Sequence, residues 1–153
     1  MSKNDFIIDG SNLTVENSIS IIRQDLKLKL SAASVKKVKA SRKLVEDWIT
    51  KDEVIYGITT GFGEFKNVKI SSKDLNTLQH NLIKSHSAGV GGVIPDDVVR
   101  LMILFRINSL AKGLSGVRLE LLEALVKFFN SGLVPLIPSQ GSVGSSGDLS
   151  PLS

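Results

Sequence analysis

Residues 95–132 read PDDVVRLMILFRINSLAKGLSGVRLELLEALVKFFNSG. Apolar residues recur at helical spacing on both sides of Gly113, which predicts two helices, over about 95–112 and 117–130. Pro95 suits the first turn of the earlier helix, because no N–H is needed there. That helix carries apolar residues almost all the way round, so we expect it to be buried.

Two more helices and a short β segment are predicted around this pair. An amphipathic pattern covers about 31–51, and a further helix starts at the N-cap Ser72, runs through Ile83 and ends near Gly89. Residues 5–9 favour a strand or a hairpin. The predicted fold class is therefore mainly α.

The composition is that of an ordinary globular domain. The chain has 153 residues, of which 42% are hydrophobic and 22% charged, and it contains no cysteine. The longest strongly apolar run, 101–105, lies between two arginines and is too short to span a membrane. The lack of thiols excludes a disulfide framework and a cysteine nucleophile, and with no evident targeting segment in residues 1–10 it favours a cytoplasmic protein.

The net charge of +4 raises the question of a nucleic-acid partner. The basic residues concentrate in one stretch without interleaved aromatic residues, so a solvated helix face is the better interpretation and no nucleic-acid or membrane partner is expected. They are Lys27, Lys29, Lys36, Lys37, Lys39, Arg42 and Lys43.

Two glycine-rich segments stand out between the helices. Residues 54–63, VIYGITTGFG, are too rich in glycine for a helix and predict an ordered loop. Residues 132–153 mix proline, glycine and serine around short apolar steps and predict a second ordered loop. Ser150 followed by Pro151 is typical of a helix start, so we expect the chain to be part of a longer protein.

The segment 141–148, GSVGSSGD, admits three interpretations. It is a flexible loop, a phosphate cradle, or a site of backbone cyclisation; the cradle lacks the lysine and the spacing of known phosphate motifs. In the third, the amide nitrogen of Gly147 attacks the carbonyl carbon of Ser145, and loss of two waters, one from the Ser146 side chain, leaves an exocyclic methylidene. Such a group is an electrophile that no standard side chain offers.

The sequence resembles the aromatic amino acid ammonia-lyase family, and most closely its histidine-specific branch. Four ordered blocks carry the resemblance: residues 56–63 (YGITTGFG), 78–91 (LQHNLIKSHSAGVG), 108–113 (NSLAKG) and 141–152 (GSVGSSGDLSPL). It implies that residues 1–153 are the N-terminal part of the fumarase/aspartase-like fold. That part is mainly α, has a short N-terminal β segment and a glycine-rich active-site loop, and is cut just after the prosthetic-group motif.

The resemblance also implies the site residues. Ser145, Ser146 and Gly147 would form the 4-methylidene-imidazol-5-one group autocatalytically, through a dehydroalanine at Ser146, with no external cofactor and no metal. Tyr56 matches a tyrosine that acts as general base, and His86 matches the residue that contacts the substrate imidazole. The implied enzyme is a homotetrameric carbon-nitrogen lyase that converts L-histidine to trans-urocanate and ammonia in the first step of histidine catabolism.

Departures from the family pattern keep alternatives open. Ser145 replaces the usual alanine, and Thr59 stands where the histidine branch commonly has asparagine. One alternative is a tyrosine or phenylalanine ammonia-lyase or aminomutase; another is a truncated, non-catalytic paralogue that assembles through the helices at 95–112 and 117–130. The 153-residue chain alone is expected to be inactive, because surrounding structure must strain the loop for it to cyclise.

Overall fold

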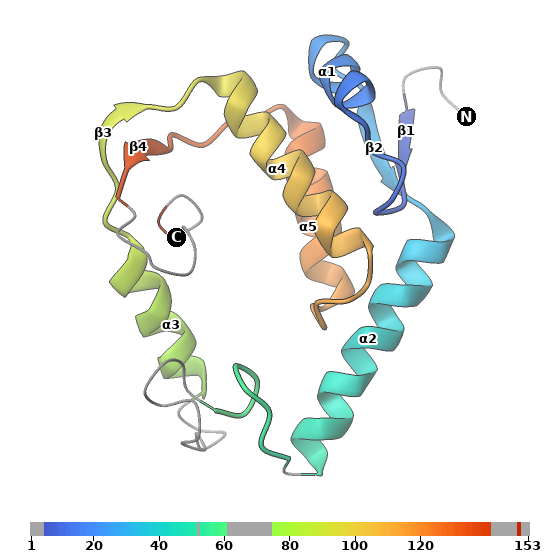
Figure 1. The fold of residues 1–153 in the computed structure, drawn as a ribbon, viewed down its shortest axis with the longest axis vertical. Coiled ribbons are helices and arrows are strands. Elements are labelled where there is room, and N and C mark those ends of the chain that lie inside the picture. Colours follow the sequence, from blue (N-terminus) through green and yellow to red (C-terminus); the bar gives the residue numbers. More distant parts are fainter. Residues whose placement is uncertain (1–4, 52, 61–74, 142–149, 151–153) are drawn as a thin grey trace. The chain divides into compact units, whose positions relative to one another are not determined.

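The computed structural model describes residues 5–51, 53–60, 75–141 and 150 (Figure 1). Helices dominate these residues, which confirms the mainly α prediction. The chain divides into two compact units, residues 1–45 with 95–135 and residues 46–94 with 136–153. The elements in chain order are β1 (Asp5–Ile8), α1 (Val15–Arg23), β2 (Lys27–Leu30), α2 (Ala32–Thr50), α3 (Leu75–His86), β3 (Val90–Val93), α4 (Asp96–Ala111), α5 (Leu119–Ser131) and β4 (Pro138–Gln140).

The first unit begins with a β1–α1–β2 segment. The two strands are parallel, with Asp5 opposite Lys27 and Ile8 opposite Leu30, so the predicted N-terminal strand is confirmed and the hairpin alternative is wrong. Parallel strands need a crossover, and α1 supplies it. This helix, which the sequence analysis did not predict, starts at a capping box in which the side chains of Thr14 and Asn17 each accept a backbone N–H of the other.

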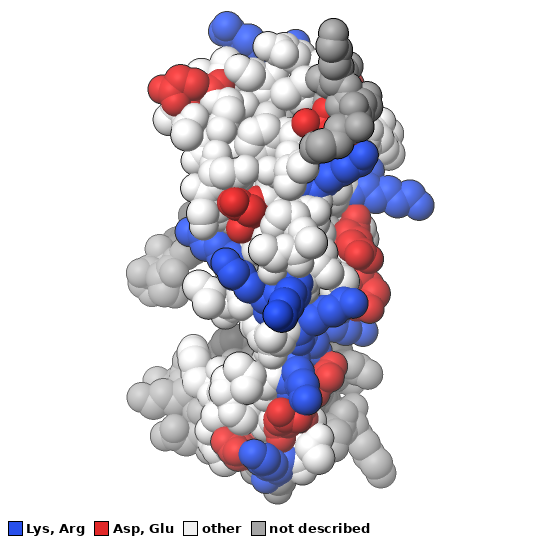
Figure 2. Space-filling view, turned by 90° about the vertical axis from the view of Figure 1, so that its right-hand side faces the viewer, with Lys and Arg blue, Asp and Glu red and all other residues white. Residues whose placement is uncertain are grey.

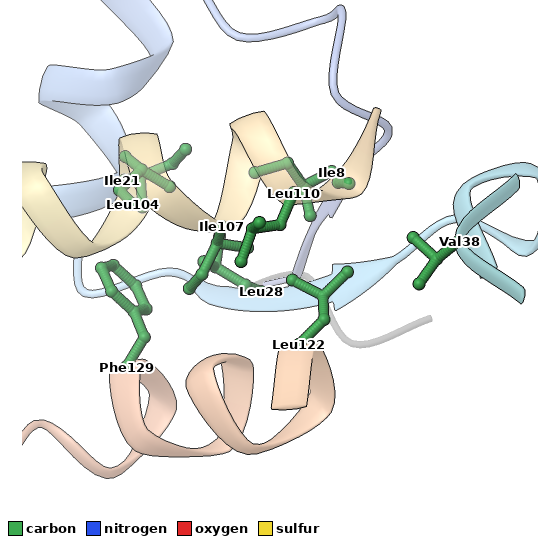
Figure 3. Packing of buried hydrophobic residues seen from close by; sticks show 10 residues of the cluster. Ile8, Ile21, Leu28, Val38, Leu104, Ile107, Leu110, Leu122 and Phe129 are labelled. Carbon is green, nitrogen blue, oxygen red and sulfur yellow. The ribbon is translucent and has the colours of Figure 1, made fainter. Parts of the chain in front are cut away.

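The core of this unit lies between the strands and the helices α4 and α5 (Figure 3). Its members are apolar side chains at most 8% exposed: Ile8, Ile21, Leu28, Val38, Leu104, Ile107, Leu110, Ala111, Leu122 and Phe129. Each large apolar side chain buried there contributes roughly 1.5–3 kcal/mol relative to exposure. The pairing of α4 with α5 and the strands therefore supplies the main stabilisation of the unit.

Helix α4 is less buried than its sequence predicted. Val99, Leu104 and Ile107 are fully buried, but Val98 is 41% exposed and Phe105 50% exposed. The expectation of burial on all sides is wrong for the described residues, because the elements of this unit cover one side of the helix only. Pro95 also lies one position earlier than expected, since it precedes the helix in extended conformation instead of sitting inside the first turn.

The side chain of Asn130, near the end of α5, closes the free edge of β2. Its amide oxygen accepts the Leu28 N–H at 2.8 Å, and its amide nitrogen donates to the Leu28 carbonyl at 2.9 Å. A strand edge that is left unpaired is a site of unwanted strand addition. Asn130 therefore connects α5 to β2 and occupies the backbone hydrogen-bonding groups of Leu28, so that another strand cannot pair there.

An ion pair and a ring contact connect α1, β2, α4 and α5. The Asp25 carboxylate lies 2.9 Å from the Lys27 amine and 2.6 Å from the Arg100 guanidinium, which also lies 5.2 Å from the centre of the Phe129 ring. Asp25 has a φ of 48°, a left-handed conformation that aspartate and asparagine tolerate. The hydrogen bond from Lys27, which has the larger effect, and the hydrogen bond from Arg100 hold the pKa of Asp25 below its ordinary value.

We expect Asp25→Asn to lower the free energy of unfolding at pH 7 by less than about 1 kcal/mol, because Asp25 is half exposed and water screens its ion pairs. The pKa of Asp25 is lower in the folded state than in the unfolded state. The carboxylate therefore contributes fully to the free energy of unfolding above the unfolded pKa of about 3.9, and this contribution is lost as the pH falls through the folded-state pKa. Urea unfolding at pH 7 and pH 3 measures this. A difference between parent and variant that is the same at both pH values would contradict it.

The basic residues of α2 are exposed, in agreement with a solvated face. Lys36, Lys37, Lys39 and Lys43 all reach the surface, and Arg42 lies 3.5 Å from the Gly116 carbonyl oxygen. Figure 2 shows basic side chains gathered on one face with acidic side chains beside them. Among the residues that the structure describes, no helix has the length and apolarity to cross a membrane.

The second unit contains α3 and a two-stranded antiparallel sheet. Val90 of β3 lies opposite Gln140 of β4, and the Ile94 N–H donates to the Ile137 carbonyl at 2.9 Å. The prediction of a loop throughout 132–153 is thus wrong for Pro138–Gln140, which form a strand. Their pairing partner lies almost fifty residues earlier, so local composition carried no signal for it.

Candidate functional site

Tyr56 lies on a tight turn after α2, within the first predicted glycine-rich loop. The N–H groups of Ile58 and Thr59 both donate to the Ile55 carbonyl, at 3.1 and 3.0 Å. Tyr56 itself is 62% exposed, while Gly57 has a φ of 73°. The turn therefore leaves Tyr56 mostly exposed within this chain, and its positive φ favours glycine at the next position.

Two buried threonines organise this turn, and neither was among the predicted site residues. The Thr59 hydroxyl donates to the Glu53 carbonyl at 2.6 Å and accepts the Ile55 N–H at 2.9 Å. Thr59 follows Tyr56 and both partners precede it, so these bonds connect the two sides of the turn. Thr60 accepts the Gly57 N–H at 3.2 Å. Their signal in the sequence is a pair of β-branched hydroxyl residues inside a glycine-rich segment, where apolar residues would otherwise fill the buried positions.

We expect Thr59→Val to lower the free energy of unfolding by about 1–3 kcal/mol, because the Ile55 N–H and the Glu53 carbonyl both lose their buried partner while the shape of the side chain is kept. Urea unfolding measures the loss. Thr59→Ser is the matched control, since it restores both hydrogen bonds. Equal stability of the valine and serine variants would show that the hydroxyl does not hold the turn.

His86 ends α3 and is half-buried. Its Nδ1 atom lies 2.8 Å from the carbonyl oxygen of Leu82, one turn earlier, and 3.0 Å from the hydroxyl oxygen of Ser85. The Ser85 hydroxyl in turn donates to the same Leu82 carbonyl at 2.8 Å. The ring is thus held by its Nδ1 side, and Ser85, which carried no predicted role of its own, belongs to this arrangement.

The base of the second glycine-rich loop packs against the segment that follows His86. Gly141 has a φ of 148°, and a side-chain carbon added there would lie 2.5 Å from the Ser150 hydroxyl oxygen and 3.0 Å from the Ala88 carbonyl oxygen. Gly141 and Ser150 therefore lie together, and they bracket the predicted Ser145, Ser146 and Gly147, which fall outside the described residues. Gly141 and Ser150 thus lie beside Ala88, two residues after His86.

The described residues thus bring two of the predicted site features together. His86 and the base of the loop are neighbours within the second unit, and Tyr56 belongs to the same unit. No group of three or more histidine, aspartate or glutamate side chains suited to a metal ion occurs within the described ranges. The roles predicted for Tyr56, for His86 and for residues 145–147 stay predictions.

Comparison with known proteins defines the class. The sequence pattern of the family described as aromatic amino acid lyase matches residues 13–153, and the chain belongs to this family.

Among curated relatives, the chain is 48% identical to the histidine ammonia-lyase of Caldanaerobacter subterraneus subsp. tengcongensis, over 95% of this chain and 29% of that protein. It is also 48% identical to the histidine ammonia-lyase of Streptococcus pyogenes serotype M3, over 95% of this chain and 28% of the relative. The chain therefore spans less than a third of the length of these relatives.

Solved structures show the same fold. The histidine ammonia-lyase of Trypanosoma cruzi superposes with a TM-score of 0.85 at 38% identity, covering 97% of this chain and 28% of that one. The ergothionase of Treponema denticola gives a TM-score of 0.88 at 31% identity, over 97% and 30% of the two chains. The tyrosine aminomutase of Streptomyces globisporus gives a TM-score of 0.86 at 38% identity, covering 97% of this chain and 28% of that one.

Proposed function

We propose that this chain belongs to an enzyme that eliminates ammonia from L-histidine and releases trans-urocanate, a reaction that begins histidine breakdown. In this elimination the Cβ–H bond of the substrate breaks and its proton goes to a base, the Cα–N bond breaks with loss of ammonia, and a Cα=Cβ double bond forms. The observation that carries the proposal is the packing of Gly141, at the base of the Ser145–Gly147 loop, beside Ala88 and close to His86. The identity to two histidine ammonia-lyases supports the choice of substrate.

The residues around the loop fit a self-formed prosthetic group. Gly141 and Ser150, which flank residues 142–149, lie together, and a side chain at Gly141 would collide with Ser150 and Ala88. In the proposal, the residues between them are compressed, as attack of a backbone nitrogen on a nearby carbonyl requires. The 4-methylidene-imidazol-5-one group, when formed from Ser145, Ser146 and Gly147, supplies an electrophilic carbon.

Tyr56 and His86 take the remaining roles in the proposal. Tyr56 lies on a turn fixed by buried threonines, and its phenol oxygen accepts the β-proton of the substrate as general base. His86, fixed through Nδ1, contacts the substrate imidazole with the opposite side of its ring. Neither residue needs a metal ion for these tasks.

The test is the intact mass of the protein from its native source together with ammonia release from three amino acids. The proposal expects the peptide spanning Gly141–Pro151 to be lighter by two waters, about 36 Da. It also expects the highest kcat/KM for L-histidine, with L-tyrosine and L-phenylalanine well below. An unmodified peptide would contradict the prosthetic group, and equal turnover of the three substrates would contradict the specificity.

A second candidate is a tyrosine or phenylalanine lyase or aminomutase. The 38% identity to a tyrosine aminomutase whose fold is equally similar favours it. An aminomutase returns the amino group to the neighbouring carbon, so it yields a β-amino acid without net release of ammonia. Product analysis in the same assay separates it from the lyase.

We further propose that the active protein is a homotetramer of the full-length subunit that acts in the cytoplasm. The apolar side chains Val98 and Phe105, exposed on α4 within this chain, support coverage of that helix by further structure. The cytoplasmic location rests on the lack of cysteine.

The assignment of residues 1–153 to one catalytic domain and the inactivity of this chain alone stay predictions. The alternative function is a non-catalytic assembly module, and an unmodified native chain ending at Ser153 would favour it.

A further inference from the structure

Three polar groups form a triangle at the C-terminal end of α3. The Leu82 carbonyl oxygen lies 2.8 Å from the Ser85 hydroxyl oxygen and 2.8 Å from the His86 Nδ1 atom. The Ser85 hydroxyl oxygen lies 3.0 Å from the same Nδ1 atom. All three contacts have hydrogen-bond length. Which proton serves each contact decides the protonation of the imidazole.

Counting protons around the triangle leaves one solution for the neutral ring. The Leu82 carbonyl has no proton and can only accept, and the Ser85 hydroxyl has one, which it donates to Leu82. If Nδ1 carried a lone pair, its 2.8 Å contact with the Leu82 oxygen would place two acceptors against each other. If Nδ1 carries the proton, it donates to Leu82 and to the lone pair of Ser85, and every contact is satisfied.

We propose that the Ser85 hydroxyl and the Leu82 carbonyl hold His86 as the Nδ1–H tautomer, which leaves the Nε2 lone pair as the hydrogen-bond acceptor that the ring offers to a substrate. Ser85 is then a positioning residue that acts through His86. The acceptor selects amino acids whose ring carries an N–H or O–H donor over those without one. This consequence for substrate choice rests on the proposed function, while the tautomer itself does not.

The tautomer is measured directly by nitrogen-15 NMR of the histidine rings in the 153-residue chain. The chain has two histidines, and the exposed His80 on the same helix serves as internal reference. The spectra are recorded at a pH of about 8.5, at which free imidazole in water is in its neutral form. We expect the His86 spectrum to show a protonated Nδ1 and a bare Nε2. A protonated Nε2 in His86 would overturn the proposal.

Variants of Ser85 test the role of its hydroxyl. In Ser85→Ala, Nδ1 loses one of its two acceptors, so the ratio of Nδ1–H to Nε2–H is expected to fall roughly 2- to 12-fold, the worth of one hydrogen bond. Ser85→Thr keeps the hydroxyl and should keep the ratio of the parent. A ratio in Ser85→Ala equal to that of the parent would overturn the positioning role of Ser85.

Kinetics on the protein purified from its native source and on its recombinant Ser85 variants test the consequence for the substrate. We expect Ser85→Ala to raise KM for L-histidine in proportion to the fraction of Nδ1–H tautomer that it loses, with kcat nearly unchanged, and Ser85→Thr to restore KM. The inhibition constant of L-phenylalanine, which has no ring donor, should not change. Equal weakening of both amino acids would overturn the selection. If the parent releases no ammonia from L-histidine, the proposed function fails, and the NMR spectra still decide the tautomer.

Discussion

Gly113→Ala is expected to lower the free energy of unfolding by roughly 2–5 kcal/mol, the largest stability effect that we predict. Gly113 has a φ of 72°, and an added side-chain carbon would lie 2.5 Å from the Lys37 Cβ atom and 2.9 Å from the Val38 nitrogen. The left-handed backbone costs an alanine about 1–2 kcal/mol, and overpacking typically costs a further 1–3 kcal/mol. The backbone of α2 cannot retreat cheaply, because Val38 is 1% exposed in the core.

Gly132→Ala is the matched control for this prediction. Gly132 ends α5 with a φ of 77°, close to that of Gly113, but an added side-chain carbon would meet nothing within 4 Å. The decrease in the free energy of unfolding caused by Gly132→Ala should therefore equal the cost of the left-handed backbone alone, about 1–2 kcal/mol. Urea unfolding of both variants separates the two contributions, and equal losses would show that the approach of Gly113 to α2 does not matter.

Ser146→Ala is expected to reduce the release of ammonia from L-histidine by on the order of 10³-fold or more, because enzymes of this kind owe at least about 10⁶-fold acceleration to their active-site chemistry. In the proposed cyclisation, loss of the Ser146 hydroxyl creates the methylidene carbon, so the variant should be unable to form the electrophile. The peptide spanning Gly141–Pro151 should then lack the full two-water mass loss. Undiminished activity would remove Ser146 from the proposed chemistry.

Ser145→Ala provides the control within the same loop. Cyclisation uses only the backbone carbonyl of that residue, so the variant should keep both the mass loss of about 36 Da and most of the activity. Mass spectrometry and the ammonia assay on both serine variants give the comparison. A similar collapse at Ser145 and Ser146 would indicate damage to the loop as a whole.

Much of the helical framework could be predicted from local sequence. Periodic apolar residues predict α2, α4 and α5 to within two residues, and glycine follows α4 and α5, because helix formation depends on side chains three and four positions apart. Helix α3 follows the same rule. The β1–α1–β2 crossover could not be predicted in this way, since the strands pair residues that are 22 positions apart and each strand contains only four residues.

The candidate site divides along a similar line. Tyr56, His86 and the Ser145–Gly147 triplet could be proposed from sequence, because the blocks that contain them resemble the aromatic amino acid lyase family; their roles stay predictions. The supporting contacts could not. Thr59 reads as one more threonine in a glycine-rich loop until both of its hydrogen bonds are seen, and Ser85 gains meaning only when its hydroxyl and the Leu82 carbonyl meet the ring of His86.

The sequence by itself indicated the helices α2, α3, α4 and α5, and it showed a serine-glycine segment at 145–147 for which we propose cyclisation. These properties follow from residue identity and short-range spacing. Only the tertiary structure decided that α4 is covered on one side, that Asn130 closes the edge of β2 from 102 residues away, and that Gly141 and Ser150 lie together beside Ala88. Each of these depends on which distant backbone and side-chain groups come within a few ångströms, and that is settled by the packing of the whole chain.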